Sequence, residues 1–566
     1  MTVPLSERDK AAVDAALTQQ RGAAGWRPTP SSQYQIGCTP PVSASWTIDV
    51  PAGCVKCASV DHIVVSLDDG WPASQLLAYA PQAPTDYSWP HVEPDGKLCL
   101  RPTRIECDTV SRVLDSVNWA IDVLNLDELQ RREEFQREFL TYWARCSAST
   151  LTFRSLVKPK SPSRMVSACR EDNGVVIAES KLDLECWLTH RFDKTPQHEI
   201  FEIPYIWLDC PWIPHEFPKI ANDIYKLLPK ETLGAVSFKT PDVPILIGSR
   251  TETGPSLVGV RVSQILPPNI LSKFRDFDKI PAKVRQTAAA KNPIEKCTVS
   301  RIDGEWIHGR DQDSGYKIVK RSRLAFVGCG ALGSNLARLV IQTGIGECLF
   351  IDDDTYESHN IYRHILDHRW IGYNKAAALA KQMAAEYPHC IAMNNLPVRF
   401  EELTVEQLDR LSEFDIIITA GLPIETEVAI SEWRSSSDDP IPQVSTWIEP
   451  YGVAGHSVAL LDSDSLLEKY SPDYKYSHQI SNWPESVRTV VPQAGCGQFF
   501  QPHTAAELQL AVNLAYRQVM ALIDGSITSS ICEVSIGDLD RMVELGGNTN
   551  AKQVDKFCTR QFPWSE

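Results

Sequence analysis

The sequence predicts an α/β protein whose C-terminal part is a largely parallel sheet with helices on its faces. Beyond Arg323, short apolar segments alternate with amphipathic ones, as they do in β-α-β units. A glycine-rich loop separates the first apolar segment from the first amphipathic one, as a tight strand-to-helix turn requires. The chain has 566 residues, which is too many for a single hydrophobic core, so we expect several domains.

The composition is that of a globular protein and argues against two classes of function. Hydrophobic residues make up 43% of the chain and charged residues 23%, and no apolar run is long enough to cross a bilayer. The formal charge of −16, without a long Lys/Arg block, disfavours direct nucleic-acid binding. The first ten residues lack the pattern of a secretory signal. We therefore expect a cytoplasmic protein without membrane contact, whose 16 scattered cysteines are reduced thiols.

Residues 1–150 predict an α+β domain. Short apolar runs with Pro-rich breaks precede two helical segments, at about 110–120 and 127–146. In the second segment, aromatic residues recur at helical spacing, and Arg and Glu occupy the other face. We expect this helix to pack on a small α+β core.

Residues 151–295 predict a mixed linking domain. Strand-like runs at 175–177, 235–238 and 244–247 are separated by Pro and Gly. No motif in this region suggests chemistry, so we expect it to set the geometry between its neighbours.

Residues 296–566 predict the third domain. Its expected strands are 324–328, 349–352 and 415–419, and its expected helices are 334–342, 374–386 and a long one over 504–522. Strands that alternate with helices in this way form a Rossmann-like sheet.

The glycine-rich loop predicts a nucleotide site. Gly328, Gly330 and Gly333 lie between an apolar strand and a helix, where glycine permits a tight turn and lets phosphate approach the helix N-terminus. Asp352 follows Gly333 by 19 residues, at the end of the next strand, where a carboxylate can accept hydrogen bonds from ribose hydroxyls. Up to this point a nicotinamide-dependent oxidoreductase fits equally well.

The residues after Asp352 favour ATP. Asp354, Asn360, Arg363 and Lys375 follow in order, and Lys375 opens a predicted helix. A hydride-transfer enzyme has no evident use for two cations here. An enzyme that splits ATP between the α- and β-phosphates does, because Arg and Lys stabilise the charge that develops on the triphosphate.

These residues resemble the ThiF/MoeB and ubiquitin-activating-enzyme superfamily, whose pattern is Asp-x-Asp, then Ser-Asn-x-x-Arg, then Gly-x-x-Lys. The resemblance implies that Asp352 holds ribose and that Asn360, Arg363 and Lys375 contact the phosphates. Arg310 is similar to the arginine that such enzymes bring to the γ-phosphate.

The same resemblance implies Mg²⁺ as a second cofactor, with a departure at its expected ligand. Family members carry an Asp soon after the strand at 415–419, but the matching positions here run from Thr419 to Pro423. Asp354 and Glu425 are the candidates to replace it, so the metal ligand stays open. A binding module that keeps the nucleotide but has lost catalysis is the alternative that this departure supports.

A cysteine in the first domain resembles an acyl-carrying thiol. The segment from His91 to Leu100 is similar to the active-site segment of ubiquitin-conjugating enzymes, with a Gly-containing turn before Cys99. Trp89 occupies the place of that family's Asn, so another group, of which His91 is a candidate, fills the oxyanion role. The alternative is that Cys99 is an ordinary buried apolar residue.

A second cysteine lies in a Gly-containing loop before the long C-terminal helix. Activating enzymes that form thioesters carry their cysteine on such a crossover segment, which implies Cys496. A position near a helix start lowers a thiol pKa and so favours nucleophilic attack. Cys329, Cys532 and Cys558 are weaker competitors, and we expect Cys329 to be structural.

The order of the predicted domains resembles the fused activating–conjugating proteins of bacterial CBASS antiphage operons. The resemblance implies adenylation of a protein's C-terminal carboxylate, transfer to Cys496 and then to Cys99, and ligation to an acceptor protein. It further implies that the modifier is a cGAS-like nucleotidyltransferase and that the chain forms a homodimer. A sulfur-carrier adenylyltransferase is the nearest alternative, although the chain lacks that class's pair of Cys-x-x-Cys motifs.

Overall fold

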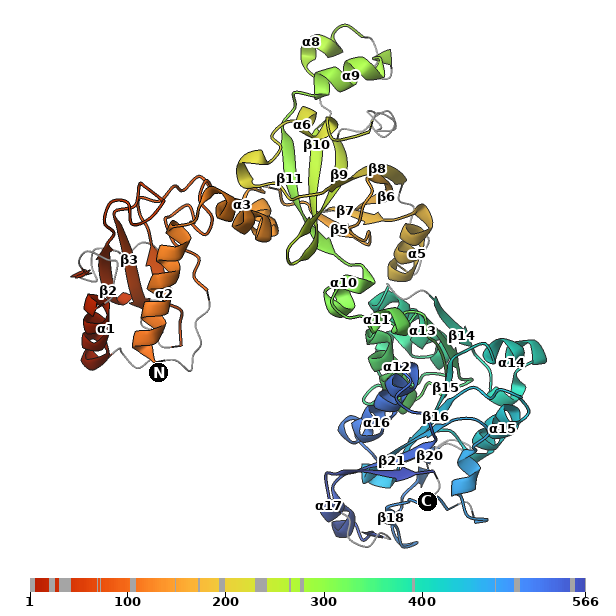
Figure 1. The fold of residues 1–566 in the computed structure, drawn as a ribbon. Helices are drawn as coiled ribbons and strands as arrows, with labels where there is room; N and C mark the ends of the chain where they lie inside the picture. The colour runs from red at the N-terminus through yellow and green to blue at the C-terminus, as the bar shows by residue number, and fades with distance from the viewer. Residues whose placement is uncertain are drawn as a thin grey trace. The chain divides into compact units, whose positions relative to one another are not determined.

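The structure is a computed structural model of the 566-residue chain. It describes residues 6–19, 26–29, 42–68, 70–71, 73–101, 108–147, 149–171, 174–192, 199–229, 242–263, 266–274, 279–388, 392–473, 475–492, 499–549 and 555–564. The chain folds into two compact units (Figure 1). The first comprises Met1–Arg154, Lys158–Ile177 and Phe201–Ser300, and the second Ser155–Val157, Ala178–Ile200 and Arg301–Glu566. The three domain limits drawn from the sequence stay a prediction.

The first unit begins with a small antiparallel sheet and two long helices. The sheet order is β1-β2-β3-β4, and the elements are α1 (Glu7–Gln19), β1 (Trp26–Thr29), β2 (Val42–Asp49), β3 (His62–Asp68), β4 (Leu77–Tyr79) and α2 (Thr109–Leu124). Helix α2 is the segment predicted at 110–120, and Asp108 caps it by accepting from the Ser111 amide. Its apolar face buries Val113, Val117 and Ala120 against β3 and β4 in one core.

The helix predicted at 127–146 is interrupted at Glu138. It forms α3 (Glu128–Arg137), capped by Asp127, and α4 (Phe139–Arg145). Glu138 ends α3 and starts α4 with φ −98° and ψ 25°. The interruption brings the aromatic residues of both helices into one core, and that shared burial compensates for the lost helical continuity.

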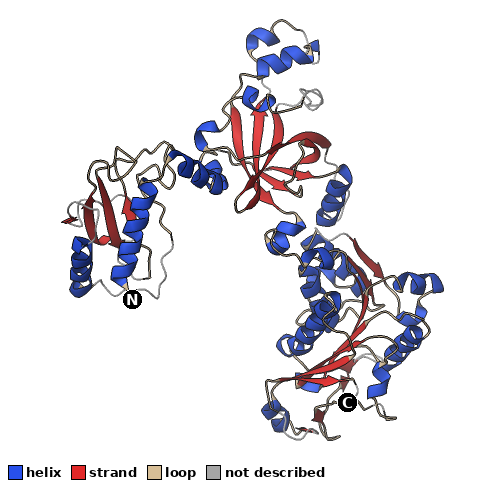
Figure 2. Cartoon of the chain, viewed as in Figure 1, coloured by secondary structure: helices blue, strands red, loops and turns tan. Residues whose placement is uncertain are grey.

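The rest of the first unit is built around a closed barrel, whose strands Figure 2 draws in red. The strand order is β10-β11-β5-β7-β6-β8-β9, with β5 (Thr152–Ser155), β6 (Arg164–Glu171), β7 (Gly174–Ala178), β8 (Ile200–Leu208), β9 (Asp242–Thr251), β10 (Gly254–Ser263) and β11 (Ile294–Arg301). Short helices join them: η1 (Pro214–Glu216), α6 (Ala221–Tyr225), α8 (Pro268–Leu271) and α9 (Ala282–Ala289). The strands predicted at 175–177 and 244–247 are confirmed as parts of β7 and β9, while 235–238 lies outside the described residues.

The second unit is built on an eight-stranded sheet of order β14-β13-β12-β15-β16-β17-β21-β23. The first five strands pair in parallel and the rest antiparallel. They are β12 (Arg323–Val327), β13 (Glu347–Ile351), β14 (Ala392–Leu396), β15 (Ile416–Ala420), β16 (Gln443–Ile448), β17 (Ala454–Leu460), β21 (Ile531–Ile536) and β23 (Thr559–Pro563). The predicted Rossmann-like sheet is confirmed for its parallel half.

Helices cover both faces of this sheet. Successive side chains of a strand point to opposite faces, and because β12, β13 and β15 are largely apolar along their length, both faces must be buried. On β12, Leu324 and Phe326 pack with α12 (Ala331–Gln342), α13 (Lys375–Glu386) and α16 (Ala505–Ile523). Ala325 and Val327 face the opposite side, toward α14 (Val405–Leu411) and α15 (Ile424–Ser435). The three predicted helices correspond to α12, α13 and α16.

The remaining elements of the second unit are short. Helix α5 (Lys181–Phe192) packs against α13. The others are α10 (Gly304–Gly309), α11 (Tyr316–Val319), η3 (Ser358–Asn360), η4 (His368–Trp370), η5 (Phe400–Glu402), η6 (Pro450–Gly452), η7 (Leu466–Lys469), β18 (Ser481–Asn482), β19 (Val491–Pro492), β20 (Phe499–Phe500), α17 (Leu539–Glu544) and β22 (Asn548–Thr549). Among the described residues, no helix has the length and apolar character that a bilayer crossing requires.

Candidate functional site

The glycine loop turns from β12 into α12 through positions where a larger residue does not fit. Gly328 has a φ of +89°, and a Cβ added to it would lie 2.8 Å from the carbonyl oxygen of Ala420. A Cβ on Gly333 would lie 2.0 Å from the carbonyl oxygen of Gly328. At Gly330, the N-cap of α12, no described atom lies within 4 Å of that position. The loop is therefore closely packed at Gly328 and Gly333 but leaves open space at Gly330, the N-terminus of α12. The amides and the dipole of a helix N-terminus favour an anion in such a space.

Asp352 is held against this loop. One of its carboxylate oxygens accepts from the Cys329 amide at 2.6 Å and the other from the Asp354 amide at 2.8 Å. Burial raises the pKa of Asp352, against the lowering effect of the Lys375 ammonium and the two amides. The contacts fix the direction of the carboxylate, and its remaining lone pairs can accept further hydrogen bonds.

Lys375 lies at the start of α13 and is buried. Its Nζ pairs with the Asp354 carboxylate at 2.7 Å, and its amide donates to the Asp354 carbonyl at 2.8 Å. Asn374 caps the helix by accepting from the Ala377 amide, and its amide group donates to the Asp352 carbonyl at 2.8 Å. Three of the predicted site residues therefore form one connected group at the carboxyl ends of β12 and β13.

Two cavities adjoin this group. One of about 680 Å³ is lined by Gly328, Asp352, Lys375 and the segment after β14, and one of about 670 Å³ by Arg363, the end of β16 and the start of α16. Both are lined by Gly330, Asp354, Ala420, Gly421 and Leu422. Strands β13 and β15 lie on opposite sides of β12, so the shared wall is at the point where the strand order reverses. Open α/β sheets bind ligands at such switch points.

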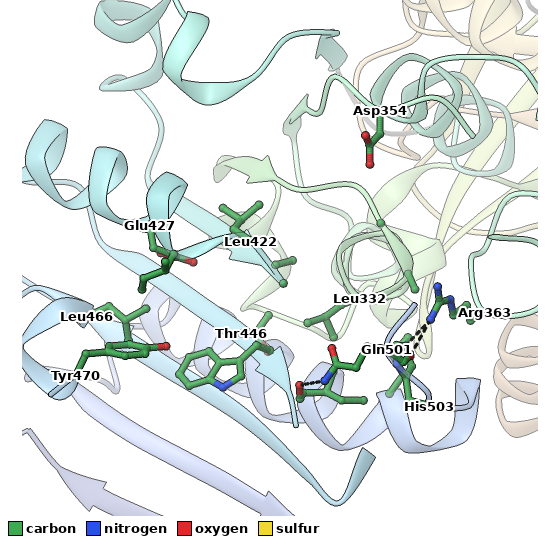
Figure 3. Close-up of a pocket in the computed structure, with 18 residues that line it drawn as sticks. Leu332, Asp354, Arg363, Leu422, Glu427, Thr446, Leu466, Tyr470, Gln501 and His503 are labelled. Atoms are coloured by element: carbon green, nitrogen blue, oxygen red, sulfur yellow. Dashed lines mark hydrogen bonds between the residues drawn. The ribbon is translucent and has the colours of Figure 1, made fainter. Parts of the chain in front are cut away.

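Arg363 lines the second cavity and is tied to the segment before α16 (Figure 3). Its Nη1 lies 3.4 Å from the Gln501 carbonyl oxygen and 3.3 Å from Nε2 of His503. Burial lowers the pKa of Arg363, and burial together with the Arg363 charge lowers the pKa of His503. His503 and Gln501 were not among the residues singled out from the sequence, since they lie about 140 positions from Arg363.

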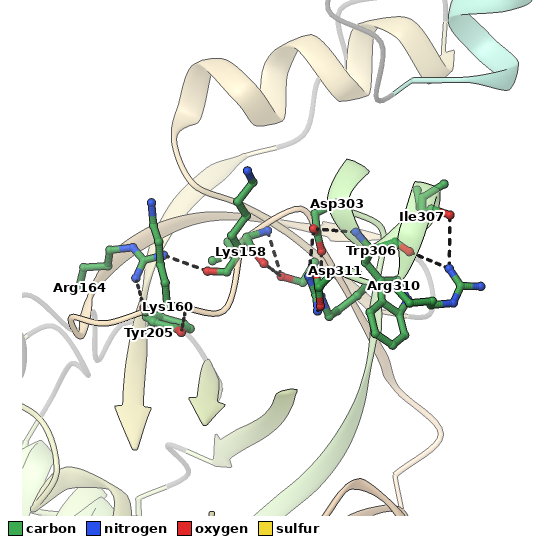
Figure 4. Close-up of polar contacts among 12 residues, drawn as sticks. Lys158, Lys160, Arg164, Tyr205, Asp303, Trp306, Ile307, Arg310 and Asp311 are labelled. Atoms are coloured by element: carbon green, nitrogen blue, oxygen red, sulfur yellow. Dashed lines mark hydrogen bonds and ion pairs between the residues drawn. The ribbon is translucent and has the colours of Figure 1, made fainter. Parts of the chain in front are cut away.

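Two predicted residues do not line either of these cavities. Asn360 ends η3, and its Oδ1 accepts from the Glu357 amide at 2.9 Å. Arg310 ends α10 with a φ of +51°, donates to the carbonyl oxygens of Trp306 at 2.7 Å and Ile307 at 3.4 Å, and stacks on the Trp306 ring (Figure 4).

Carboxylates near the shared wall fit a divalent cation. Asp352, Asp353 and Asp354 place one oxygen each within 4.8 Å of one another, and hard oxygen ligands are those that Mg²⁺ prefers. Glu425, the other predicted candidate, lines the first cavity. Thr419 lines neither cavity, and its buried hydroxyl donates to Glu427 at 2.7 Å. The three aspartates and Glu425 are therefore better candidates for metal ligands than Thr419.

Parts of the chain are similar to known proteins. Residues 309–499 match the ThiF family. Part of the chain is 23% identical over 239 residues to the ATP-dependent ubiquitin transferase-like protein Cap2 of Pseudomonas aeruginosa, covering 41% of this chain and 42% of that protein. It is 26% identical over 397 residues to Cap2 of Vibrio cholerae, covering 62% and 66%.

These matches confirm the resemblance that the motifs predicted. The chain spans less than two thirds of the length of each of these two relatives. Among solved structures, Escherichia coli MccB with ATP matches at 13% identity, 44% of this chain, 66% of that chain and a TM-score of 0.30.

Outside the region that matches the ThiF family, Cys99 is exposed, and its backbone amide and carbonyl are both hydrogen-bonded. Its amide donates to the His91 carbonyl at 2.8 Å, and its carbonyl accepts from Nε1 of Trp119 at 3.1 Å. The alternative that Cys99 is an ordinary buried residue does not hold, since its side chain reaches solvent.

The His91 ring is buried and its two nitrogens face carboxylates. Nε2 lies 3.1 Å from Glu134 and Nδ1 lies 3.6 Å from Glu138, while the His91 amide donates to the Tyr142 hydroxyl at 2.7 Å. Both nitrogens are thus directed to α3 and α4, an arrangement that gives no support to the predicted oxyanion role of this ring.

The surroundings of Cys99 disfavour its thiolate. Partial burial raises the pKa of the Cys99 thiol most, and the charges of Glu138 and Glu93 raise it further, while Arg145 and Lys97 lower it. Glu93 and Arg145 form an ion pair at 2.9 Å.

Cys496 lies outside the described residues, so its prediction stays as it was. Among its competitors, Cys329 is fully buried, and that burial raises its pKa well above the ordinary value, as a structural role requires. Cys532 is buried in the core under β17 and β21, and Cys558 is half-buried with its Sγ 2.9 Å from the Asp555 carbonyl.

Proposed function

We propose that the chain activates the C-terminal carboxylate of a protein with ATP and passes the acyl group through two cysteines to an acceptor. The connected group of Asp352, Asp354 and Lys375 at the wall shared by two cavities supports this most strongly. One cavity is suited to the nucleoside and the other to the polypeptide tail, so that the two reactants meet at the shared wall.

In this proposal each group of the ThiF domain has a distinct task. Asp352 accepts hydrogen bonds from the ribose, the open N-terminus of α12 at Gly330 faces the phosphates, and Lys375 and Arg363 supply positive charge. The predicted phosphate contacts of Asn360 and Arg310 rest on the sequence pattern alone. Asp354, with its two neighbours or Glu425, would hold Mg²⁺, which supplies charge neutralisation at the phosphates when bound.

The first step joins the tail to AMP. A carboxylate oxygen attacks the α-phosphorus, the bond to the β-phosphate oxygen breaks, and pyrophosphate leaves. The cations stabilise the negative charge that grows on the leaving group. A mixed anhydride between the tail and AMP remains.

The following steps are acyl transfers. The Cys496 thiolate attacks the anhydride carbonyl and AMP leaves, and the Cys99 thiolate then displaces the Cys496 thiolate. An acceptor amine finally attacks the Cys99 thioester, loses a proton, and releases the thiolate. The exposure of Cys99 suits a thiol that must meet an acceptor protein.

The same proposal assigns roles to the regions and partners. Residues 1–150 act as a ubiquitin-conjugating-like domain, 151–295 as a linking domain and 296–566 as the adenylation domain. The modifier in this proposal is a cGAS-like nucleotidyltransferase, in antiphage defence, as the resemblance to CBASS fusion proteins implies. A cytoplasmic homodimer is the expected state.

Pyrophosphate release tests the proposal. Purified protein with ATP, Mg²⁺ and the tail of a co-encoded nucleotidyltransferase should release pyrophosphate and show hydroxylamine-sensitive adducts on Cys496 and Cys99 by mass spectrometry. Nicotinamide cofactors should undergo no reduction. If no tail leads to pyrophosphate release, the result would falsify the proposed function.

A further inference from the structure

The cavity lined by Arg363 carries a carboxyl group at its other end. Figure 3 shows Glu427 beside Leu466 and Tyr470, across the cavity from Arg363 and His503. Glu427 reaches this wall because it lies one helical turn after Ile424 in α15, and both residues line the cavity. The cavity is therefore basic at one end and acidic at the other.

The Glu427 carboxyl is buried and is bound only by neutral groups. Its side chain is 6% exposed. Oε1 accepts from the Thr419 hydroxyl at 2.7 Å, and Oε2 from Nε2 of Gln443 at 3.1 Å and from the Ser445 hydroxyl at 3.4 Å. Among the described residues, no Lys, Arg or His forms an ion pair with it. A buried carboxylate without a cation is costly, and such groups are enriched at functional sites.

A purely structural role does not explain the charge. The hydroxyl and amide groups around Glu427 join α15 to β15 and β16. The carboxamide of glutamine has nearly the same shape, but it keeps only one of the two acceptor oxygens and replaces the other with an NH2 donor. The Oε1 atom of Gln443 has no hydrogen-bond partner among the described atoms and would suit the amide that glutamine would bring. These hydrogen bonds hold the side chain in place, but among the described residues they leave its negative charge without a counter-charge.

We propose that the Glu427 end of this cavity is a subsite for a cationic side chain, Lys or Arg, of the modifier's C-terminal tail. The inference rests on the proposed function, because the tail must lie in this cavity for its terminal carboxylate to reach the wall at Asp354. Apolar side chains of Leu332 and Leu422 line the middle of the cavity, so the residues between the cation and the carboxylate are small or apolar. An ammonium or guanidinium would give Glu427 its missing counter-charge.

Synthetic tails test the subsite. Ten-residue peptides that end in Gly carry either Lys or its neutral isostere norleucine at each of positions two to eight from the C-terminus. Pyrophosphate release is measured for wild type, Glu427→Gln and Glu432→Gln, a control at an exposed glutamate of the same helix. At one position, Lys should lower the KM of the wild type about tenfold relative to norleucine, as a charge-assisted hydrogen bond does.

The variants distinguish recognition from structure. Glu427→Gln should lose the preference for Lys, so that its KM values for the Lys and norleucine peptides become equal, and Glu432→Gln should keep the preference. Pyrophosphate release without a preferred position overturns the subsite but leaves the proposed function intact. Equal losses with both peptides in Glu427→Gln show a structural role and also overturn it. No release with any peptide contradicts the proposed function, and the subsite with it.

The pH dependence gives a second readout. Burial raises the pKa of Glu427 to about 7, against the lowering effect of its three hydrogen bonds. Thr419, Gln443 and Ser445 do not titrate, and burial with the Glu427 charge raises the pKa of Tyr470, the titratable group that faces Glu427, to about 12. Glu427 is therefore charged above about pH 7, so the preference for Lys should grow from pH 6 to pH 8. A preference that is flat over this range contradicts an ionised Glu427 as its source.

Discussion

The surroundings of Lys375 and of Cys99 are built in opposite ways. Lys375 is buried at a cavity wall, and its partner Asp354 belongs to a loop that also fixes Asp352. Cys99 is exposed, and the groups that contact it are backbone atoms and an indole. The first arrangement is organised before a small ligand arrives, and the second leaves room for a macromolecule.

The charged groups around Lys375 and around Cys99 also differ. The cations near the glycine loop favour a triphosphate, whereas Glu138 and Glu93 near Cys99 disfavour a thiolate. In the proposed sequence Cys496 reacts with the adenylate, whereas Cys99 takes its acyl group from another thiol in a thioester exchange that uses no further ATP. Activation and transfer are then separate tasks that variants can dissociate.

Cys99→Ala should give the largest effect. Because the variant has no thiol to form the second thioester, conjugate formation should fall at least about a thousandfold, while ATP–pyrophosphate exchange stays as in the wild type. Gel analysis of conjugates alongside isotope exchange measures both. Cys210→Ala, at another exposed cysteine of the same unit, is the matched control and should conjugate normally. Normal conjugation by Cys99→Ala removes the conjugating role.

Lys375→Ala should impair activation and hence every later step. Loss of a charge that stabilises the leaving pyrophosphate should lower exchange about a hundredfold. Lys381→Ala, at an exposed position of the same helix, controls for the loss of a lysine from α13. Circular dichroism should show both variants folded. Wild-type exchange by Lys375→Ala would mean that Asp354 and Lys375 are only a structural pair.

The contrast between the two places also explains what the sequence could predict. The glycine loop, Asp352 and Lys375 follow one another within about fifty residues, and the parallel strands that carry them are short apolar runs with clear boundaries. Local spacing therefore predicted the parallel half of the sheet, and the family pattern pointed to Asp352, Asp354 and Lys375, but the pairing of Lys375 with Asp354 came only from the structure. The same local logic placed Asn360 beside them, although its side chain caps its own turn.

Features made by distant pairing were beyond local spacing. The barrel closes through β10 with β11 and through β8 with β9, and nothing in a single strand shows that a sheet closes on itself. Glu427 lies at the cavity because β16 pairs with β15, and His503 lies there because the segment before α16 contacts Arg363. The acids that face His91 come from α3 and α4, some forty residues later.

The smallest expected effect concerns those acids. Partial burial and then Glu138 raise the pKa of Cys99, so Glu138→Gln should lower that pKa and leave more thiolate at pH 8. Alkylation of Cys99 by iodoacetamide, followed by peptide mass spectrometry, should be about threefold faster in this variant, with a difference that shrinks as the pH rises above the thiol pKa. Glu133→Gln, at an exposed site of α3, should react like the wild type. Equal rates in Glu138→Gln and the wild type would mean that burial alone restrains the thiol. The opposite charge environments of the two places would then no longer account for their division of labour.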